Sequence, residues 1–297
     1  MTLPLARKRI RISAGEMAYV DMGEGRPVIL LHGFPTSAHL WRREAWLLAQ
    51  RMRVIVPDLV GYGESDQLSD AELSELAQAG YVGELLAALG IDEVAVVGHD
   101  VGGAIAQTLA LEGHPTVRAL VLLDSVCFEA WPTEAVRIAQ AVRPEDETAA
   151  SADEIVRATF ALGVAHRDRL AEEDVAAYLR PWQRDPAALF RAARGLTGKG
   201  VSGREAELGD PDLPALIIWG EADPFLRSEL AERLGEAIPG STVALLPGCS
   251  HFVNEDAPQV VGPLISEYLR ARYLNERHDH GGEPVTVLLE RPPAGFR

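Results

Sequence analysis

Short apolar runs alternate along the chain with segments whose apolar residues recur at helical spacing. An uninterrupted apolar run of about four to eight residues is typical of a strand buried on both faces of a parallel sheet. Such runs lie at 28–31, 53–57, 94–97, 117–123, 214–219 and 242–246, and 9–22 predicts two further short strands. The segments with helical spacing are 40–50, 71–89, 101–111, 226–238 and 256–274. This alternation predicts an α/β fold, a mostly parallel central sheet with helices on both faces.

The alternation stops between residues 127 and 212, where helical patches and acidic clusters replace the apolar runs. We therefore predict an inserted helical lid at 127–212 and a core domain formed by 1–126 and 213–274. Residues 275–297 are rich in charge, Pro and Gly and are predicted to form a C-terminal tail. The run His278-Asp279-His280 in this tail is interpreted as incidental polar sequence, because no further metal ligands accompany it.

Polar residues follow the ends of several predicted strands. Ligands of parallel α/β sheets bind beyond the carboxyl ends of the strands, so residues at these ends are expected to meet. The residues and segment placed there are 32–35, Asp100, Asp124, Asp223 and His251. Their shared position predicts one active site at this edge of the sheet.

The turn at 98–103 joins the predicted strand 94–97 to the predicted helix 101–111. Strand, Gly-x-acid-x-Gly and helix is the layout of a nucleophile elbow, which projects its central side chain over the sheet. The central residue is Asp100, between Gly98 and Gly102. A carboxylate that attacks a saturated carbon leaves an ester, which water can hydrolyse, whereas a serine would leave an ether. Asp100 therefore suits displacement at saturated carbon, such as opening an epoxide or expelling a halide.

Composition and charge limit the kinds of molecule that the protein is expected to bind. The chain has 297 residues and a formal net charge of −16, which disfavours binding to nucleic acid or to an anionic membrane surface. It has 47% hydrophobic residues and only two cysteines, so it can bury a core and shows no disulfide framework. Neither a signal peptide nor a membrane span is visible, and we expect a cytoplasmic protein with a small organic substrate, no metal or organic cofactor, and a possible homodimer.

Five motifs carry a resemblance to a known family: HGFPTSAHLW (32–41), PDLVGYGESD (57–66), GHDVGG (98–103), WGEADPF (219–225) and GCSHFVNEDAP (248–258). Together they resemble the Asp-nucleophile branch of the α/β-hydrolase fold superfamily, which includes epoxide hydrolases and haloalkane dehalogenases. The chain order of nucleophile, acid and base also matches that layout. The resemblance implies a two-step hydrolysis through an aspartyl ester, with a helical lid over the site.

The resemblance implies a role for each candidate residue. Asp100 would be the nucleophile and His251 the base that activates water against the ester. Asp223 is favoured as the acid that orients His251, and Asp124 is the alternative. The backbone N–H groups of Phe34 and Val101 would form the oxyanion hole.

The residues that would contact the leaving group do not decide between two reactions, epoxide opening and haloalkane dehalogenation. We favour epoxide opening, because Phe34 in HGFP suits that group and Tyr178 of the lid is a candidate proton donor. Haloalkane dehalogenation is the alternative, with lid Trp131 and Trp182 as candidate donors, although Val101 stands where dehalogenases usually have Trp. The remaining pocket candidates are His32 and His99, which are expected to fix loops. A third hypothesis is a non-hydrolytic member of the fold, namely a lyase, cyclase or ligand receptor.

Fluoroacetate dehalogenases resemble the chain at GHD (98–100) but place arginines just after it, which bind a carboxylate. Here Val101 and Ala104 occupy those positions. This difference disfavours a small anionic haloacid as the substrate.

Overall fold

The computed structural model describes residues 6–198, 200–209 and 213–275. Within them, one eight-stranded sheet forms the centre of the molecule, with the strand order β1-β2-β4-β3-β5-β6-β7-β8. The first two pairs, β1 with β2 and β2 with β4, are antiparallel, and every later pair is parallel. The strands are β1 Lys8–Ile12, β2 Gly15–Met22, β3 Pro27–Leu31, β4 Arg53–Pro57, β5 Glu93–His99, β6 Thr116–Leu123, β7 Ala215–Gly220 and β8 Thr242–Leu246. The predicted mostly parallel sheet is confirmed.

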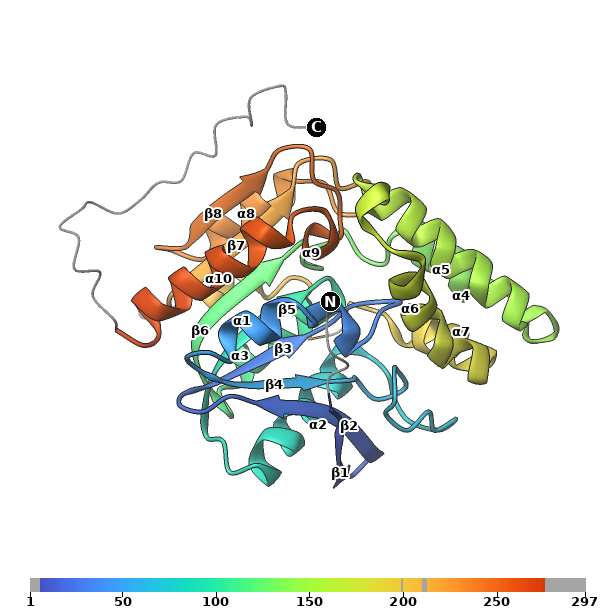
Figure 1. Ribbon diagram of the computed structural model, residues 1–297, viewed down its shortest axis with the longest axis horizontal. Coiled ribbons are helices and arrows are strands. Elements are labelled where there is room, and N and C mark those ends of the chain that lie inside the picture. Colours follow the sequence, from blue (N-terminus) through green and yellow to red (C-terminus); the bar gives the residue numbers. More distant parts are fainter. Residues whose placement is uncertain (1–5, 199, 210–212, 276–297) are drawn as a thin grey trace.

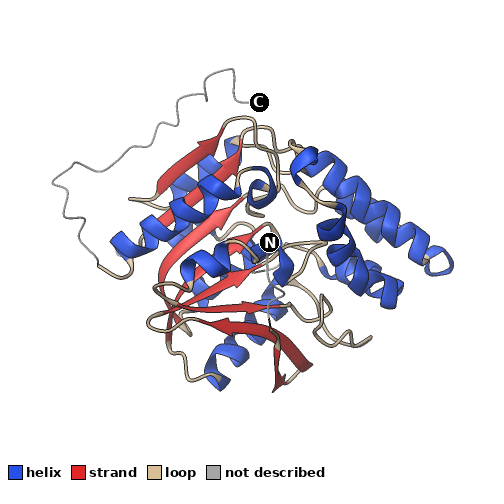
Figure 2. Ribbon diagram, in the orientation of Figure 1, coloured by secondary structure: helices blue, strands red, loops and turns tan. Residues whose placement is uncertain are grey.

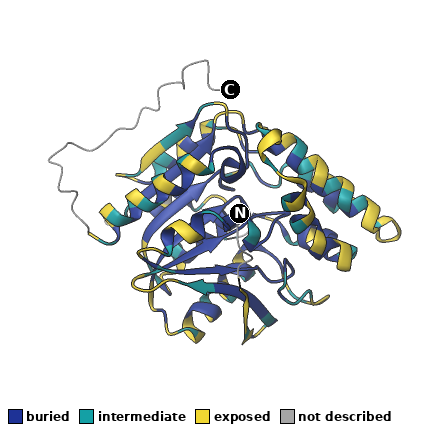
Figure 3. Ribbon diagram, viewed as in Figure 1, coloured by how far each residue is buried: buried dark blue, intermediate teal, exposed yellow. Residues whose placement is uncertain are grey.

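The central strands are dark in Figure 3 because nearly every residue in them is buried. Helices cover both faces of the sheet (Figure 1). On it lie α1 Glu44–Leu48, α2 Glu75–Ala88, α3 Val101–Glu112, α8 Glu229–Ala237, α9 Val253–Asp256 and α10 Pro258–Arg272. Helix α1 packs against α10 and α2 packs against α3. Residues buried on both sides explain why the strand sequences are continuously apolar rather than alternating.

Two helix predictions differ most from the structure in their bounds. The segment 40–50 forms a 3-10 helix, η1 Ala38–Trp41, followed by the short α1, and the break falls at Arg42 and Arg43. Both arginines bind the buried Glu255, so the backbone turns to bring their side chains inward. The segment 71–89 becomes helical only at Glu75, because the Ser74 side chain accepts a hydrogen bond from the Ala77 N–H and caps the helix there.

Between β6 and β7 helices are the only regular elements of the described chain, and most of them stand to one side of the sheet in Figure 2. They are α4 Glu134–Gln140, η2 Pro144–Asp146, α5 Ala149–Gly163, η3 Arg167–Arg169, α6 Glu172–Arg184, α7 Pro186–Gly195 and η4 Glu205–Leu208. We call α4 to α7 the insertion helices. Within this group α4 packs against α7 and α5 packs against α6.

No helix in the described ranges is long and apolar enough to cross a membrane. Both cysteines, Cys127 and Cys249, are buried and unpaired. The predicted tail, except for Asn275, and its run His278-Asp279-His280 lie outside the described residues.

Candidate active site

The turn between β5 and α3 holds Asp100 in a backbone conformation that few side chains adopt, with φ of 55° and ψ of −119°. The two flanking glycines allow this turn. A Cβ on Gly98 would lie 2.2 Å from the Gly102 carbonyl oxygen, and a Cβ on Gly102 would lie 2.1 Å from the Leu31 carbonyl oxygen. The Gly-x-Asp-x-Gly spacing therefore reflects steric necessity, and the strain is concentrated at the residue that projects over the sheet.

The Asp100 carboxylate is held by backbone donors from two loops. Its Oδ1 accepts a hydrogen bond of 3.0 Å from the Phe34 N–H, and the Val101 N–H also bonds the carboxylate. Asp100 is only 3% exposed. Burial raises the pKa of its carboxyl to about 6, although His251 and the two N–H groups oppose the rise. The group is therefore ionised at neutral pH and poorly solvated, which suits a nucleophile.

His251, which lies between β8 and α9, faces this carboxylate. Its Nε2 is 3.6 Å from Asp100 Oδ2, which is too long for a hydrogen bond, and its Nδ1 is 2.8 Å from Asp223 Oδ2. Asp223 is itself fixed, because its Oδ1 accepts from the N–H groups of Phe225 and Leu226 at 2.8 and 3.0 Å. Burial would lower the pKa of His251, but the charge and hydrogen bond of Asp223, with a smaller contribution from Asp100, raise it above 6.5.

Asp124, the alternative acid, lies near this pair but contacts a different group. Its Oδ1 accepts a 2.8 Å hydrogen bond from the Gly220 N–H, and its buried Oδ2 has no hydrogen-bond partner among the described residues. Burial and then the neighbouring Asp223 charge raise its pKa well above the usual value, which favours the protonated acid. Ligand atoms of Asp124, Asp223 and His251 lie within 4.8 Å of one another, which would suit a metal by distance alone. Two of these groups, Asp223 and His251, are already hydrogen-bonded to each other at 2.8 Å, as in an acid–base pair.

The other two histidines at the strand ends hold loops in place. His32 accepts at Nε2 from the Leu59 N–H (3.1 Å), and its Nδ1 donates to the Gly33 carbonyl (3.0 Å). His99 Nε2 donates to the carbonyl of His251 at 3.0 Å, and the two rings lie 4.7 Å apart. Burial lowers the pKa of both His32 and His99, so both are neutral. They position the catalytic candidates and do not line the cavity described next.

A narrow cavity lies over Asp100, between the sheet edge and the insertion. Only about 20 Å³ is open to the centres of water molecules, room for one or two waters. The core contributes Phe34, Asp100, Phe225 and His251 to its wall. The insertion side contributes Trp131, Thr133, Ala135, Val136 and Thr159. The wall is therefore mostly apolar, with the carboxylate and imidazole at one end.

The N–H groups of the two candidate tryptophans are already bonded elsewhere. Trp131 lines the cavity, but its Nε1 donates to the buried carboxylate of Glu75 at 2.8 Å. Trp182 packs edge-on against Tyr62, and its Nε1 donates to the Pro35 carbonyl at 2.9 Å. Both side chains thus anchor the insertion to the core.

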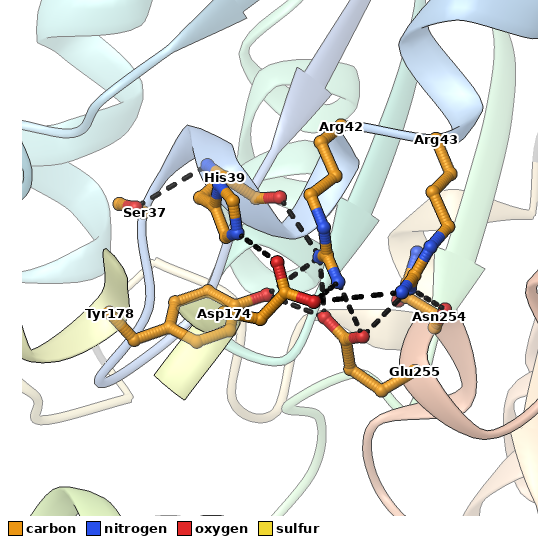
Figure 4. A network of polar contacts seen from close by, with 8 residues as sticks. All are labelled: Ser37, His39, Arg42, Arg43, Asp174, Tyr178, Asn254 and Glu255. Atoms are coloured by element: carbon orange, nitrogen blue, oxygen red, sulfur yellow. Dashed lines mark hydrogen bonds and ion pairs between the residues drawn. The ribbon is translucent and has the colours of Figure 1, made fainter. Parts of the chain in front are cut away.

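Tyr178 of α6 lies away from the cavity, in the buried polar network of Figure 4. Its hydroxyl donates to Glu255 Oε1 at 2.7 Å, and the Arg42 guanidinium approaches the same hydroxyl oxygen at 3.4 Å. Burial and the Glu255 charge raise the pKa of Tyr178 well above its usual value. The hydroxyl therefore serves as a donor to a core carboxylate and is unavailable to a ligand beside Asp100.

The same network carries strong ion pairs (Figure 4). Arg42, 2% exposed, makes a two-pronged contact with Glu255 at 2.6 and 2.8 Å, and its Nη2 lies 2.9 Å from Asp174 Oδ2. His39 contacts the other oxygen of Asp174 at 2.8 Å. Burial opposes the charge on Glu255, yet Arg42 keeps its pKa below the usual value. Because Asp174 lies on α6 and Glu255 on α9, this network joins the insertion to the segment that carries His251.

Several residues of the candidate site belong to no recognisable sequence pattern. Thr133 and Thr159 lie in the cavity wall, and Glu75 holds Trp131, yet isolated Thr and Glu residues have no distinguishing spacing. Phe225 and Glu255 do fall within motifs named above, WGEADPF and GCSHFVNEDAP. Phe225 lies two residues after Asp223 and Glu255 four residues after His251, and this closeness is the signal that could have identified them.

Comparisons with known proteins agree with this geometry. A family model described as "alpha/beta hydrolase fold" matches residues 26–258. Haloalkane dehalogenase 2 of Mycobacterium tuberculosis is 31% identical over 270 residues, covering 86% of this chain and 92% of that protein. Fluoroacetate dehalogenase of a Burkholderia species is 30% identical over 270 residues, covering 83% and 88%.

Among solved structures, an α/β hydrolase fold protein from Burkholderia ambifaria superposes with a TM-score of 0.81 at 31% identity. The match covers 90% of this chain and 99% of the other. The sheet order, the elbow and these relatives lead to one conclusion: the chain belongs to the α/β-hydrolase fold family and is a hydrolase of that family.

Proposed function

We propose that the protein hydrolyses small, uncharged haloalkanes through an ester on Asp100. The observation that carries this proposal is the Asp100 carboxylate itself, with Oδ1 bonded by the Phe34 N–H at 3.0 Å and Oδ2 facing His251 Nε2 at 3.6 Å. In the first step Oδ2 forms a bond to the substrate carbon. The carbon–halogen bond breaks, and the halide leaves with its electron pair.

In the second step, water attacks Cγ of the alkylated Asp100 and gives a proton to His251 Nε2. Negative charge develops on Oδ1, where the N–H groups of Phe34 and Val101 stabilise it. Cleavage of the Cγ–Oδ2 bond releases the alkoxide, which takes the proton back from His251 and leaves as the alcohol. The new carboxyl group then ionises, so each turnover yields an alcohol, a halide and a proton.

Asp223 is proposed as the acid that orients His251. Its 2.8 Å contact keeps the imidazole proton on Nδ1, which leaves Nε2 free to accept from water. Asp124 accepts a hydrogen bond from the Gly220 N–H and burial raises the pKa of its carboxyl, so it fits a structural role.

The leaving group decides between the two hydrolytic reactions. Epoxide opening produces an alkoxide that needs an acid, and the tyrosine favoured for this from the sequence donates instead to Glu255. A departing halide needs no proton. The two curated relatives described above are dehalogenases, which favours the halide. We therefore prefer dehalogenation, and epoxide hydrolysis becomes the second candidate.

The substrate class follows from the cavity wall. No lysine or arginine is among its described residues, and Val101 and Ala104 follow the nucleophile. A haloacid carboxylate would meet the Asp100 charge without a cationic partner. We expect short haloalkanes to be turned over much faster than fluoroacetate or chloroacetate.

The insertion helices are proposed to act as a cap that excludes water from the ester-forming step. A homodimer and a cytoplasmic location stay predictions. In the non-hydrolytic alternative Asp100 would form no ester.

A substrate panel tests the proposal. Wild-type protein and Asp100→Asn are incubated with 1-bromobutane, 1,2-epoxybutane and chloroacetate, and bromide, diol and glycolate are measured. We expect catalytic bromide release from the wild type and none from Asp100→Asn. Diol without bromide would identify the epoxide reaction, and the absence of every product would favour the non-hydrolytic alternative.

A further inference from the structure

A halide that leaves an apolar cavity needs a hydrogen-bond donor, because a bare anion is poorly solvated there. The Phe34 and Val101 N–H groups bond the Asp100 carboxylate and are therefore committed to the nucleophile. A donor for the halide must come from another side chain in the wall. The polar side chains among the described wall residues, apart from Asp100 and His251, are Trp131, Thr133 and Thr159.

Two of these three are occupied. Trp131 Nε1 donates to Glu75 at 2.8 Å, and that carboxylate also accepts from the Gly198 N–H. The Thr159 hydroxyl donates to the Ile155 carbonyl, one turn earlier in α5, at 2.8 Å.

Thr133 differs from both. It precedes α4 as the N-cap residue, and its Oγ1 accepts a long, 3.4 Å hydrogen bond from the Val136 N–H. Accepting this bond leaves the O–H proton of Thr133 free, and no acceptor for it is found within the described ranges. The hydroxyl hydrogen rotates about the Cβ–Oγ1 bond, so it can point at an atom in the cavity.

We propose that the Thr133 hydroxyl donates a hydrogen bond to the departing halide, and that Thr133 is a catalytic residue of the ester-forming step. This inference rests on the proposed dehalogenation. As Asp100 Oδ2 bonds to carbon, the halogen departs with the electron pair of the broken bond and the Thr133 O–H stabilises the growing charge. No proton is transferred, which suits an alcohol of ordinary acidity and a halide leaving group.

The test measures halide release in a single turnover, with the His251→Gln background used to isolate ester formation from ester hydrolysis. The substrates are 1-chlorobutane, 1-bromobutane and 1-iodobutane, which differ only in the leaving group. Because chloride concentrates charge most and is the poorest leaving group, it needs the donor most. Thr133→Val should slow chloride release roughly 10- to 100-fold and iodide release much less, since a hydrogen bond to a charged group has about this worth.

Controls separate the donor from the helix cap. Thr133→Ser keeps both the cap and the hydroxyl, and should retain the wild-type dependence on the halide. Thr133→Asp keeps the cap acceptor without an O–H donor, so it should remain folded yet lose chloride release. Thr159→Val makes the same chemical change on the same wall, and its effect should be equal for the three halides because its hydroxyl is bonded to Ile155.

Equal losses for all three halides in Thr133→Val, or wild-type chloride release in Thr133→Asp, would overturn the inference. These outcomes differ from failure of the proposed function. If dehalogenation itself is wrong, protein with an intact Thr133 releases no halide and forms no butyl adduct.

Discussion

The core and the insertion, which face each other across the cavity, are organised differently. On the core side, the carboxylates of Asp100 and Asp223 and the imidazole of His251 each have specific hydrogen-bond partners that fix their direction. On the insertion side, the conspicuous polar side chains bond back to the core. Trp131 donates to Glu75, Trp182 to Pro35, and Tyr178 to Glu255.

This difference indicates a separate role for each side. The core side contains charged groups whose solvation has been replaced by fixed protein contacts, which is the arrangement expected for bond-making chemistry. The insertion side uses its best donors to fasten itself to the core, which fits its proposed role of excluding water from the cavity. What remains for the leaving group is a threonine hydroxyl, which favours halide departure over alkoxide protonation.

The largest contrast is expected between the two buried aspartates beside His251. Asp223→Asn should lower turnover by about 10²- to 10⁴-fold, because the amide N–H donates to Nδ1 and forces the imidazole proton onto Nε2. Asp124→Asn should stay near the wild type, since burial already disfavours the charge on Asp124 and the amide oxygen of Asn can still accept from the Gly220 N–H. The turnover of both variants is measured by steady-state kinetics. A larger loss of turnover in Asp124→Asn than in Asp223→Asn would assign the orienting role to Asp124.

The pH dependence should separate the two chemical steps. Ester formation needs ionised Asp100, so it is lost as the pH falls below about 6. Hydrolysis needs neutral His251, whose pKa is raised above 6.5, mainly by Asp223, so hydrolysis fails first as the pH falls. The ester should therefore accumulate in the wild-type enzyme at pH values where His251 is protonated but Asp100 is still ionised. Mass spectrometry of acid-quenched protein measures this fraction, and an adduct that grows with rising pH would contradict the assignment.

A smaller effect is expected on the insertion side. Tyr178→Phe removes the hydrogen bond to Glu255 and should lower the free energy of unfolding by about 1–3 kcal/mol. Turnover per folded molecule should stay close to that of the wild type, because the hydroxyl lies away from the cavity. Chemical denaturation measures the change in the free energy of unfolding, and initial rates measure the turnover per folded molecule. A large loss of turnover at unchanged stability would restore the role of Tyr178 as a proton donor.

The sequence can indicate which core residues lie together beside Asp100, because the geometry there is imposed locally. Gly98 and Gly102 are required by the backbone approach around Asp100, and His251 follows a strand whose position is set by its apolar pattern. Such constraints act over a few neighbouring residues and are therefore visible as a short motif in the sequence. The preference for Asp223 over Asp124 rested on strand position, and the structure brings Asp223 against His251 Nδ1.

The insertion side is harder to predict, because residue type does not say where a helical side chain points. The hydroxyl of Tyr178 makes it a candidate proton donor, yet the direction of this side chain depends on Arg42 and Glu255, which are more than seventy residues away in sequence. Likewise, nothing in the sequence separates Thr133 from Thr159. Their difference lies in whether a carbonyl of the same helix accepts the hydroxyl proton.

The aspartyl ester is the central claim, and His251→Gln tests it most directly. Ester formation should proceed in this variant while hydrolysis stops, because no base activates the water. Incubation with 1-bromobutane should release one bromide per protein chain and then cease, and peptide mass spectrometry should locate one butyl group on Asp100. Continued catalytic bromide release, or bromide release without a butyl group on Asp100, would contradict the account.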